Sequence, residues 1–136
     1  MTSPDHAPIR VVLADDTRDI RLLLSLALEL AGGFVVVGEA ADGDEAIVQA
    51  TVHQPDVLLL DLAMPVLDGL QALPRIREQA PESLIVVLSG FGAEAMGEEA
   101  VRLGATTYVQ KGVNPTELAE QLRALVRDRT AAQGAP

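Results

Sequence analysis

Carboxylate, hydroxyl and amine side chains stand at the ends of four apolar runs in this sequence of 136 residues. Asp15 and Asp16 follow the first run, Asp61 lies near the end of another, and Ser89 and Lys111 come after two later ones. Three carboxylates brought close together repel one another, so that at least one is driven towards protonation unless a cation shares the site. Mg²⁺ suits such a set because it accepts a few carboxylates, keeps several waters and binds phosphate oxygens. The residue types therefore predict a magnesium site, if the fold brings them together.

The apolar runs alternate along the chain with segments of helical spacing. The runs are residues 9–14, 34–37, 57–62, 84–88 and 106–109, and the helical segments are 19–30, 44–52, 70–79, 93–103 and 115–127. The runs show little polar alternation, as expected of strands that are buried on both faces of a parallel sheet. This pattern predicts an α/β fold, a doubly wound (βα)5 three-layer sandwich with helices on both faces of the sheet.

Glycine and proline mark several boundaries of these elements. Gly32 and Gly33 can adopt the left-handed conformation that ends a helix, and Asn114 and Pro115 supply a cap and a first-turn proline for the last one. Pro74 falls inside the third helical segment, where it removes one hydrogen-bond donor. We therefore expect a kink or a late start in that helix.

Open parallel sheets bind their ligands beyond the carboxyl ends of the strands. In a sheet of order 2-1-3-4-5, the first, third, fourth and fifth strands lie side by side. The five polar residues at their ends should then converge on one edge of the sheet: Asp15, Asp16, Asp61, Ser89 and Lys111.

The stretches around these residues resemble those of bacterial response-regulator receiver domains, in the same order and with the same separations. They are VVLADD, DVLLLDLAMPVLDG, LIVVLSG and GATTYVQKG, and the resemblance covers residues 9–127. Within this family, the Lys-Gly pair at residues 111–112 resembles most the receivers of helix-turn-helix transcription factors. We do not expect their output domain in this chain. The resemblance implies a flavodoxin-like fold of strand order 2-1-3-4-5 and a signalling switch that is operated by phosphorylation.

The resemblance also implies a role for each site residue. Asp61 would accept the phosphoryl group from a histidine kinase or a phosphotransfer protein. Mg²⁺ would be held directly by Asp16, Asp61 and the backbone carbonyl of Ala63, and by Asp15 largely through water. Lys111 and Ser89 would bind the phosphoryl oxygens. The chain would not be an enzyme in the ordinary sense, because it would catalyse only its own phosphotransfer and its own slow dephosphorylation.

In this family, a movement of the hydroxyl residue makes room for an aromatic residue of the fifth strand. These residues would be Ser89 and Tyr108 here, and the face built from the fourth helix, fifth strand and fifth helix would change its affinity for partners. Ala63 and Phe91 occupy the positions that tune the phosphoryl lifetime, and neither can orient a water, so we expect slow self-dephosphorylation. Gly112 replaces the proline that usually follows the lysine, so we expect a trans peptide bond and a mobile loop.

Three other functions compete with this interpretation. A phosphatase of the haloacid dehalogenase type needs a second acid two residues after the nucleophile, where this chain has Ala63. A flavin or dinucleotide carrier needs glycines or hydroxyls in its first loop, and Asp15 and Asp16 would repel its phosphates. A degenerate receiver, which binds a protein partner without being phosphorylated, stays open as an alternative.

Composition sets the remaining expectations. The chain is 49% hydrophobic, contains no cysteine and carries a formal charge of −10, which argues against direct contact with nucleic acid. No signal peptide or membrane span is apparent, so we expect a cytoplasmic protein without a membrane partner.

We expect a flexible N-terminus over residues 1–8, a receiver domain over 9–129 and a flexible tail over 130–136. The downstream partner would be an unknown output protein or a missing output domain, and phosphorylation could link two copies into a dimer.

Overall fold

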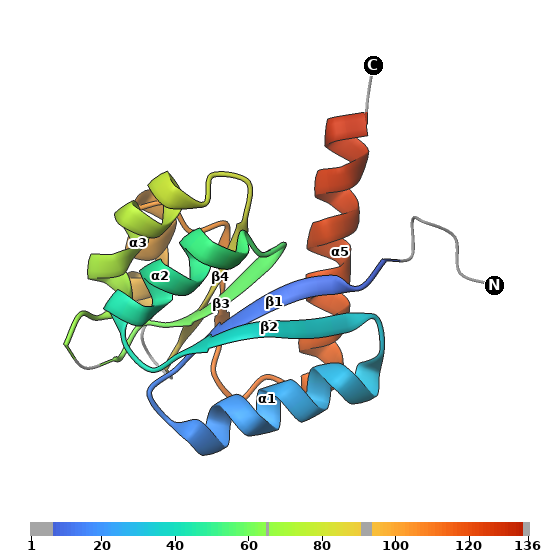
Figure 1. The fold of residues 1–136 in the computed structure, drawn as a ribbon, viewed down its shortest axis with the longest axis horizontal. Helices are drawn as coiled ribbons and strands as arrows, with labels where there is room; N and C mark the ends of the chain where they lie inside the picture. The colour runs from blue at the N-terminus through green and yellow to red at the C-terminus, as the bar shows by residue number, and fades with distance from the viewer. Residues whose placement is uncertain (1–6, 65, 91–93, 135–136) are drawn as a thin grey trace.

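The computed structural model describes residues 7–64, 66–90 and 94–134, and its centre is a parallel sheet covered by helices (Figure 1). The strands are β1 (Ile9–Ala14), β2 (Phe34–Ala40), β3 (Val57–Asp61), β4 (Leu84–Ser89) and β5 (Thr107–Gln110). The helices are α1 (Arg18–Ala31), α2 (Gly43–His53), α3 (Gly69–Gln79), α4 (Glu94–Arg102) and α5 (Pro115–Gly134). The five strands lie in the order β2-β1-β3-β4-β5. The predicted fold class and strand order are therefore confirmed.

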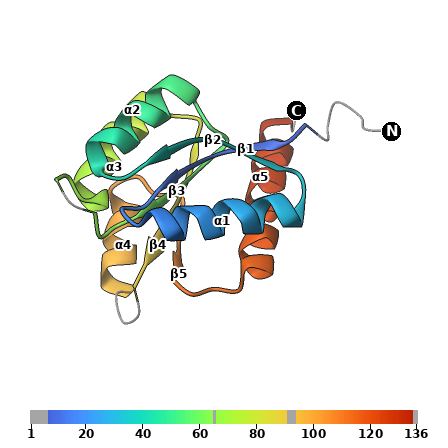
Figure 2. The same cartoon turned by 60° about the horizontal axis from the view of Figure 1, so that its bottom comes forward.

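Helices cover both faces of the sheet, with α1 and α5 on one face and α2, α3 and α4 on the other (Figure 2). Successive residues of a strand point to opposite faces, so each strand contributes to two cores. In β1, Val11 and Leu13 belong to the core beneath α1 and α5, whereas Val12 and Ala14 belong to the core beneath α2, α3 and α4. This two-sided burial explains why the apolar runs of the sequence lack polar alternation.

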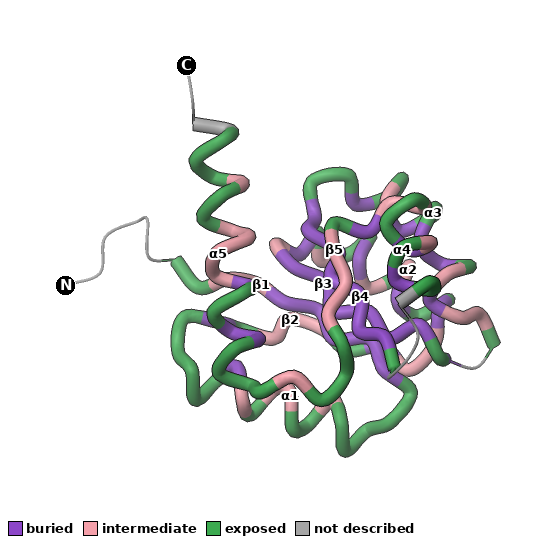
Figure 3. Tube along the Cα trace, turned by 180° about the vertical axis from the view of Figure 1, so that it is seen from behind, coloured by how far each residue is buried: buried purple, intermediate pink, exposed green. Residues whose placement is uncertain are grey.

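Burial is greatest in the three central strands, and the edge strands are only partly buried (Figure 3). Every residue of β3 and β4 is buried, whereas β5 has none that is fully buried. The register aligns the strand ends, because Ala14 pairs with Leu60 and Asp61 pairs with Leu88. The carboxyl ends of β1, β3 and β4 therefore form one continuous edge, on which the polar residues stand.

The expected late start of the third helix is wrong, because α3 begins at Gly69 and Pro74 lies inside it. A capping box explains the early start. The Asp68 carboxylate accepts a hydrogen bond from the Gln71 backbone N–H, and the Gln71 side chain accepts one from Asp68 N. A kink at Pro74 stays a prediction.

Other boundaries differ by a few residues. β2 continues to Ala40, and α5 continues to Gly134, so residues 130–134 are helical here. The flexibility expected of that tail stays a prediction, and residues 1–6 and 135–136 lie outside the described part of the chain.

The cap expected at Asn114 is confirmed, since its side chain accepts a hydrogen bond from Thr116 N at 2.8 Å. None of the helices described is both long enough and apolar enough to cross a lipid bilayer.

Candidate functional site

The turn after β1 holds two acids in different environments. Asp15 is only 2% exposed, and its Oδ1 accepts a hydrogen bond from the Thr17 backbone N–H at 2.9 Å. Arg21 fixes the same turn from α1, because its guanidinium donates to the carbonyl oxygen of Asp15 and pairs with Glu39 at 2.8 Å. Asp16 is exposed. The turn therefore presents one buried and one solvated carboxylate at the end of the strand.

Asp61 ends β3 and is 1% exposed. Its Oδ1 accepts a hydrogen bond from the Ala63 backbone N–H at 3.1 Å, which orients the carboxylate. Gly69 packs against the end of the same strand, because a Cβ on that residue would lie 2.6 Å from the Asp61 carbonyl oxygen. The Gly69 backbone N–H donates to the Leu62 carbonyl at 3.0 Å. Asp68 thus caps α3, and the absence of a side chain at Gly69 lets this helix begin directly against Asp61.

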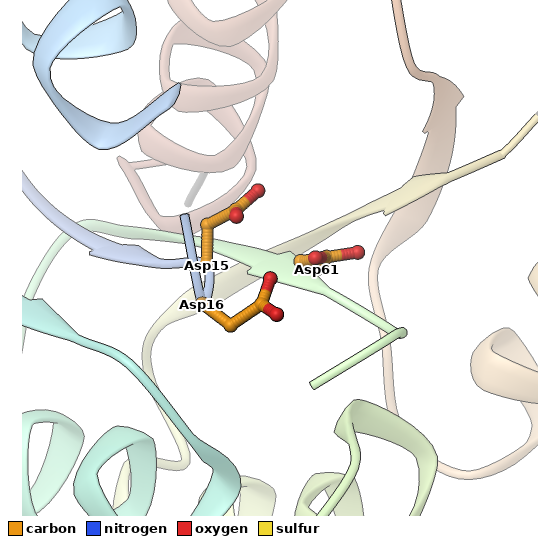
Figure 4. Close-up of side chains that lie close together, drawn as sticks. All are labelled: Asp15, Asp16 and Asp61. Carbon is orange, nitrogen blue, oxygen red and sulfur yellow. The ribbon is translucent and has the colours of Figure 1, made fainter. Parts of the chain in front are cut away.

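The three carboxylates lie together at the edge of the sheet (Figure 4). One carboxylate oxygen from each of Asp15, Asp16 and Asp61 lies within 4.8 Å of the others. Asp15 Oδ2 and Asp61 Oδ2 are buried and accept no hydrogen bond from any group in the described part of the chain. Leaving a buried acceptor unpaired is costly, and a hard cation ligated by carboxylates removes that cost. This set of oxygens therefore fits Mg²⁺.

Lys111 supplies the positive charge of the cluster. Its Nζ lies 2.9 Å from Asp61 Oδ1 and 4.0 Å from Asp15 Oδ2. Its backbone N–H donates to the Ser89 carbonyl at 2.7 Å, so the end of β4 fixes the position of the Lys111 backbone. Lys111 is also the sole lysine of the sequence, in which every other strong base is an arginine. An ammonium is a compact point charge with three donors, whereas the planar guanidinium is larger and donates in fixed directions.

Burial raises the pKa of Asp15 above its ordinary value, and this is the largest influence on that group. The hydrogen bond from Thr17 lowers the pKa, the charge of Asp61 raises it, Lys111 lowers it and Asp16 raises it slightly. The net direction is upward. Burial is the main cause, and the charges of Asp61 and Asp16 act in the same direction, as expected of carboxylates that lie close together.

The other expected site residues lie around this cluster. Ser89 is buried at the end of β4 and pairs in register with Gln110 of β5, two positions beyond the pair of Val87 and Tyr108. Tyr108 packs against the core beneath α4. Ala63 is exposed after Asp61. Phe91 lies outside the described residues, so its place in the site stays a prediction.

Gly112 has a φ of 91°, a conformation that glycine adopts readily. The described residues include no cis peptide bond, so the trans bond expected after Lys111 is confirmed. The mobility expected of this loop stays a prediction.

Two contributors to the site were not predicted from the sequence, namely Thr17 and Arg21. Thr17 follows an Asp pair, and such a residue commonly donates its N–H to the first carboxylate, so a local signal existed. Arg21 had no comparable signal, because its contact with Glu39 depends on how α1 crosses β2.

An apolar groove of about 220 Å³ opens beside the cluster, between α1 and the start of α5. Leu23, Val113 and Leu118 are among its apolar residues, and Asp15 and Lys111 also line it. Leu22 and Leu26 expose further apolar surface on α1. The charged site is thus flanked by a surface that can contact apolar side chains of another molecule.

Known proteins share both the sequence and the fold. The model of the response regulator receiver domain family matches residues 11–123. The chemotaxis protein CheY of Thermotoga maritima is 34% identical over 113 residues, which cover 83% of this chain and 93% of that protein. The protein-glutamate methylesterase/protein-glutamine glutaminase 2 of Anaeromyxobacter dehalogenans is 40% identical over 122 residues, which are 90% of this chain but only 35% of that protein.

Among solved structures, a chain of the CheX-CheY-BeF3-Mg²⁺ complex from Borrelia burgdorferi matches with a TM-score of 0.79 and 26% identity. The match covers 88% of this chain and 90% of that one. The fold, the edge of acids and lysine, and the family model over most of the chain agree with one another. The chain belongs to the family of response regulator receiver domains.

Proposed function

We propose that this chain is a phosphorylation-operated signalling switch in which Asp61 accepts the phosphoryl group. The observation that carries the proposal is the pairing of Asp61 with Lys111 at 2.9 Å inside a cluster of three carboxylates. Membership of the receiver family supports the same function. A lysine beside a carboxylate nucleophile neutralises charge on a phosphoryl group during its transfer.

In the proposed reaction, the phosphoryl group comes from a phosphohistidine of a histidine kinase or a phosphotransfer protein. A P–O bond forms to an Asp61 carboxylate oxygen while the donor P–N bond breaks, and the imidazole nitrogen keeps the electron pair and takes a proton from water. Lys111 and the hydroxyl of Ser89 would bind phosphoryl oxygens. Mg²⁺ bound by Asp15, Asp16, Asp61 and the Ala63 carbonyl would supply further positive charge to those oxygens.

The groove between α1 and α5 supports a protein as the phosphoryl donor. It is apolar, and it adjoins both Asp15 and Lys111. Apolar side chains of a donor protein could fill it and bring a phosphohistidine to the edge of the sheet. Such a donor, and with it a cytoplasmic location, is part of the proposal.

The output would pass through Ser89 and Tyr108 to the face built from α4, β5 and α5. A phosphoryl group adds nearly two negative charges, and a hydroxyl drawn towards it leaves its former position. This face would then bind an output protein, an attached output domain or a second phosphorylated copy. Direct binding of nucleic acid or a membrane forms no part of the proposal.

The test is incubation of the purified chain with Mg²⁺ and a small acyl phosphate, followed by intact mass measurement. We expect wild type to gain the mass of one phosphoryl group. We expect Asp61→Asn to gain none, because the asparagine amide has no carboxylate oxygen to attack phosphorus. Asp68→Asn is the matched control, since this N-cap lies on the same loop and asparagine also caps helices well. Absence of the added mass on wild type would indicate the degenerate receiver instead, and undiminished addition to Asp61→Asn would exclude Asp61 as the acceptor.

The phosphorylated chain is expected to lose its phosphoryl group slowly. Ala63, two residues after Asp61, has no polar side chain with which to orient an attacking water, and the same is true of Phe91. Replacing Ala63 by asparagine is expected to shorten the lifetime, because its amide can hydrogen-bond a water. The measurement is the decay of the phosphorylated mass after removal of the donor. A wild-type lifetime of only seconds would contradict this expectation.

A further inference from the structure

The ring of Tyr108 lies directly against the backbone of α4 at Gly97. A Cβ added to Gly97 would lie 2.5 Å from Cγ and Cδ2 of that ring and 2.9 Å from Cδ1. Carbon atoms in contact are normally 3.5 to 4.0 Å apart. With the ring in this position, no residue other than glycine fits at position 97 unless something moves.

The backbone conformation does not explain the glycine. Gly97 is not among the glycines with positive φ, which are Gly32, Gly33, Gly104 and Gly112. It lies inside α4, where glycine is one of the weakest helix formers. The close approach of the Tyr108 ring is therefore the physical reason that the structure offers for this glycine.

The ring also borders a small cavity near the end of the sheet. The cavity has a volume of about 90 Å³ and is lined by Ser89, Gly90, Tyr108 and Gln110. Tyr108 therefore lies between the α4 backbone and a space that it shares with Ser89. A change in the position of either side chain alters the space left for the other.

We propose that Gly97 is a positioning residue for the switch, because its missing side chain lets Tyr108 occupy the space between β5 and α4. α4 packs against β5 along this contact. The inference rests on the proposed function only in taking Tyr108 as the side chain that responds to phosphorylation. Replacing Gly97 by alanine moves the ring out of this space towards solvent.

The sequence provides a specific probe for this position, because Tyr108 is the sole tyrosine and the chain has no tryptophan. Acrylamide quenching of tyrosine fluorescence in the unphosphorylated protein therefore reports on this ring. In Gly97→Ala we expect the quenching constant to rise about twofold, because the ring loses the helix that covers it. Glu98→Ala, at an exposed neighbouring position of α4, is the matched control and leaves the quenching unchanged. Unchanged quenching in Gly97→Ala means that α4 moves instead of the ring, and overturns the proposal.

A double-mutant cycle gives a second readout that helix stability alone does not reproduce. In a Tyr108→Ala background, Gly97→Ala raises the urea midpoint of unfolding, because alanine is the better helix former and no ring opposes it. With Tyr108 present, the same substitution lowers the midpoint or leaves it unchanged. An equal rise in both backgrounds overturns the proposal.

Phosphorylation separates failure of this inference from failure of the proposed function. Gly97→Ala still gains one phosphoryl group by intact mass, since Asp61 and Lys111 are untouched, but the change in Tyr108 quenching on phosphorylation is smaller than in wild type. If wild type gains no phosphoryl group, the proposed function fails while the quenching results on the unphosphorylated protein still decide the role of Gly97. If both proteins gain it and change their quenching equally, Gly97 has no part in the switch.

Discussion

Replacing Lys111 by methionine is expected to slow phosphoryl incorporation from a small acyl phosphate by about 10² to 10³-fold, the usual effect of removing one preorganised charge donor. Lys111 is the cation that pairs with Asp61, and among the described residues no other cation forms an ion pair with the acid cluster. Methionine keeps an unbranched apolar stem of similar length, so the packing around the stem is retained. The measurement is the initial rate of mass gain at fixed donor and Mg²⁺ concentrations.

Lys111→Arg is the matched control for charge. It keeps a positive charge at the same position, but its guanidinium is larger and planar. We expect a rate between those of wild type and Lys111→Met, which would separate the need for charge from the need for an ammonium. A wild-type rate in Lys111→Met would show that the ion pair with Asp61 has no part in the transfer.

Replacing Asp15 by asparagine is expected to raise the free energy of unfolding in metal-free buffer at neutral pH by about 1 to 3 kcal/mol, the usual cost of an unsatisfied buried acceptor. Asp15 Oδ2 is buried without a hydrogen-bond donor, and Asp61 and Asp16 add repulsion. Asparagine removes the charge and keeps an oxygen that can accept the Thr17 N–H. Urea unfolding at constant ionic strength measures the change.

The pH dependence should follow from the raised pKa of Asp15. The folded protein holds the proton of this group to higher pH than the unfolded chain, whose value is near 3.8. Stability therefore falls as the pH rises from about that value through the raised pKa, and the loss is complete above it. Asp15→Asn should lack this contribution, so its advantage over wild type should shrink as the pH is lowered.

Mg²⁺ should reduce the stability advantage of Asp15→Asn over wild type. A ligand that binds only the folded state at ten times its Kd stabilises that state by about 1.4 kcal/mol. Wild type should gain stability on addition of Mg²⁺, and Asp15→Asn should gain much less. Asp128→Asn, an exposed substitution on α5 with the same change of net charge, should respond as wild type does. An equal response of Asp15→Asn and wild type would mean that Asp15 does not contribute to the metal site.

The sequence by itself determined the order of the elements and the chemistry of the site. Buried parallel strands must be apolar on both faces, so the five runs were recognisable without any tertiary information. The strand ends then placed Asp15, Asp16 and Asp61 on one edge, because the carboxyl ends of parallel strands lie together. Local capping signals were also sufficient at Gly32 and Asn114. At α3, however, Pro74 by itself predicts a kink or a late start, whereas the capping box of Asp68 and Gln71 starts the helix at Gly69.

Only the tertiary structure decided which of these acids is buried and what lies against it. The pKa of Asp15 depends on burial by elements distant in sequence. The ion pair of Arg21 with Glu39, which holds Arg21 beside the Asp15 carbonyl, depends on α1 crossing β2. The contact of Gly97 with Tyr108 likewise joins a helix and a strand, and nothing in the sequence near either residue indicates it. Such contacts are set by how close packed elements approach one another, to within the width of a methyl group, and that distance is a property of the whole core.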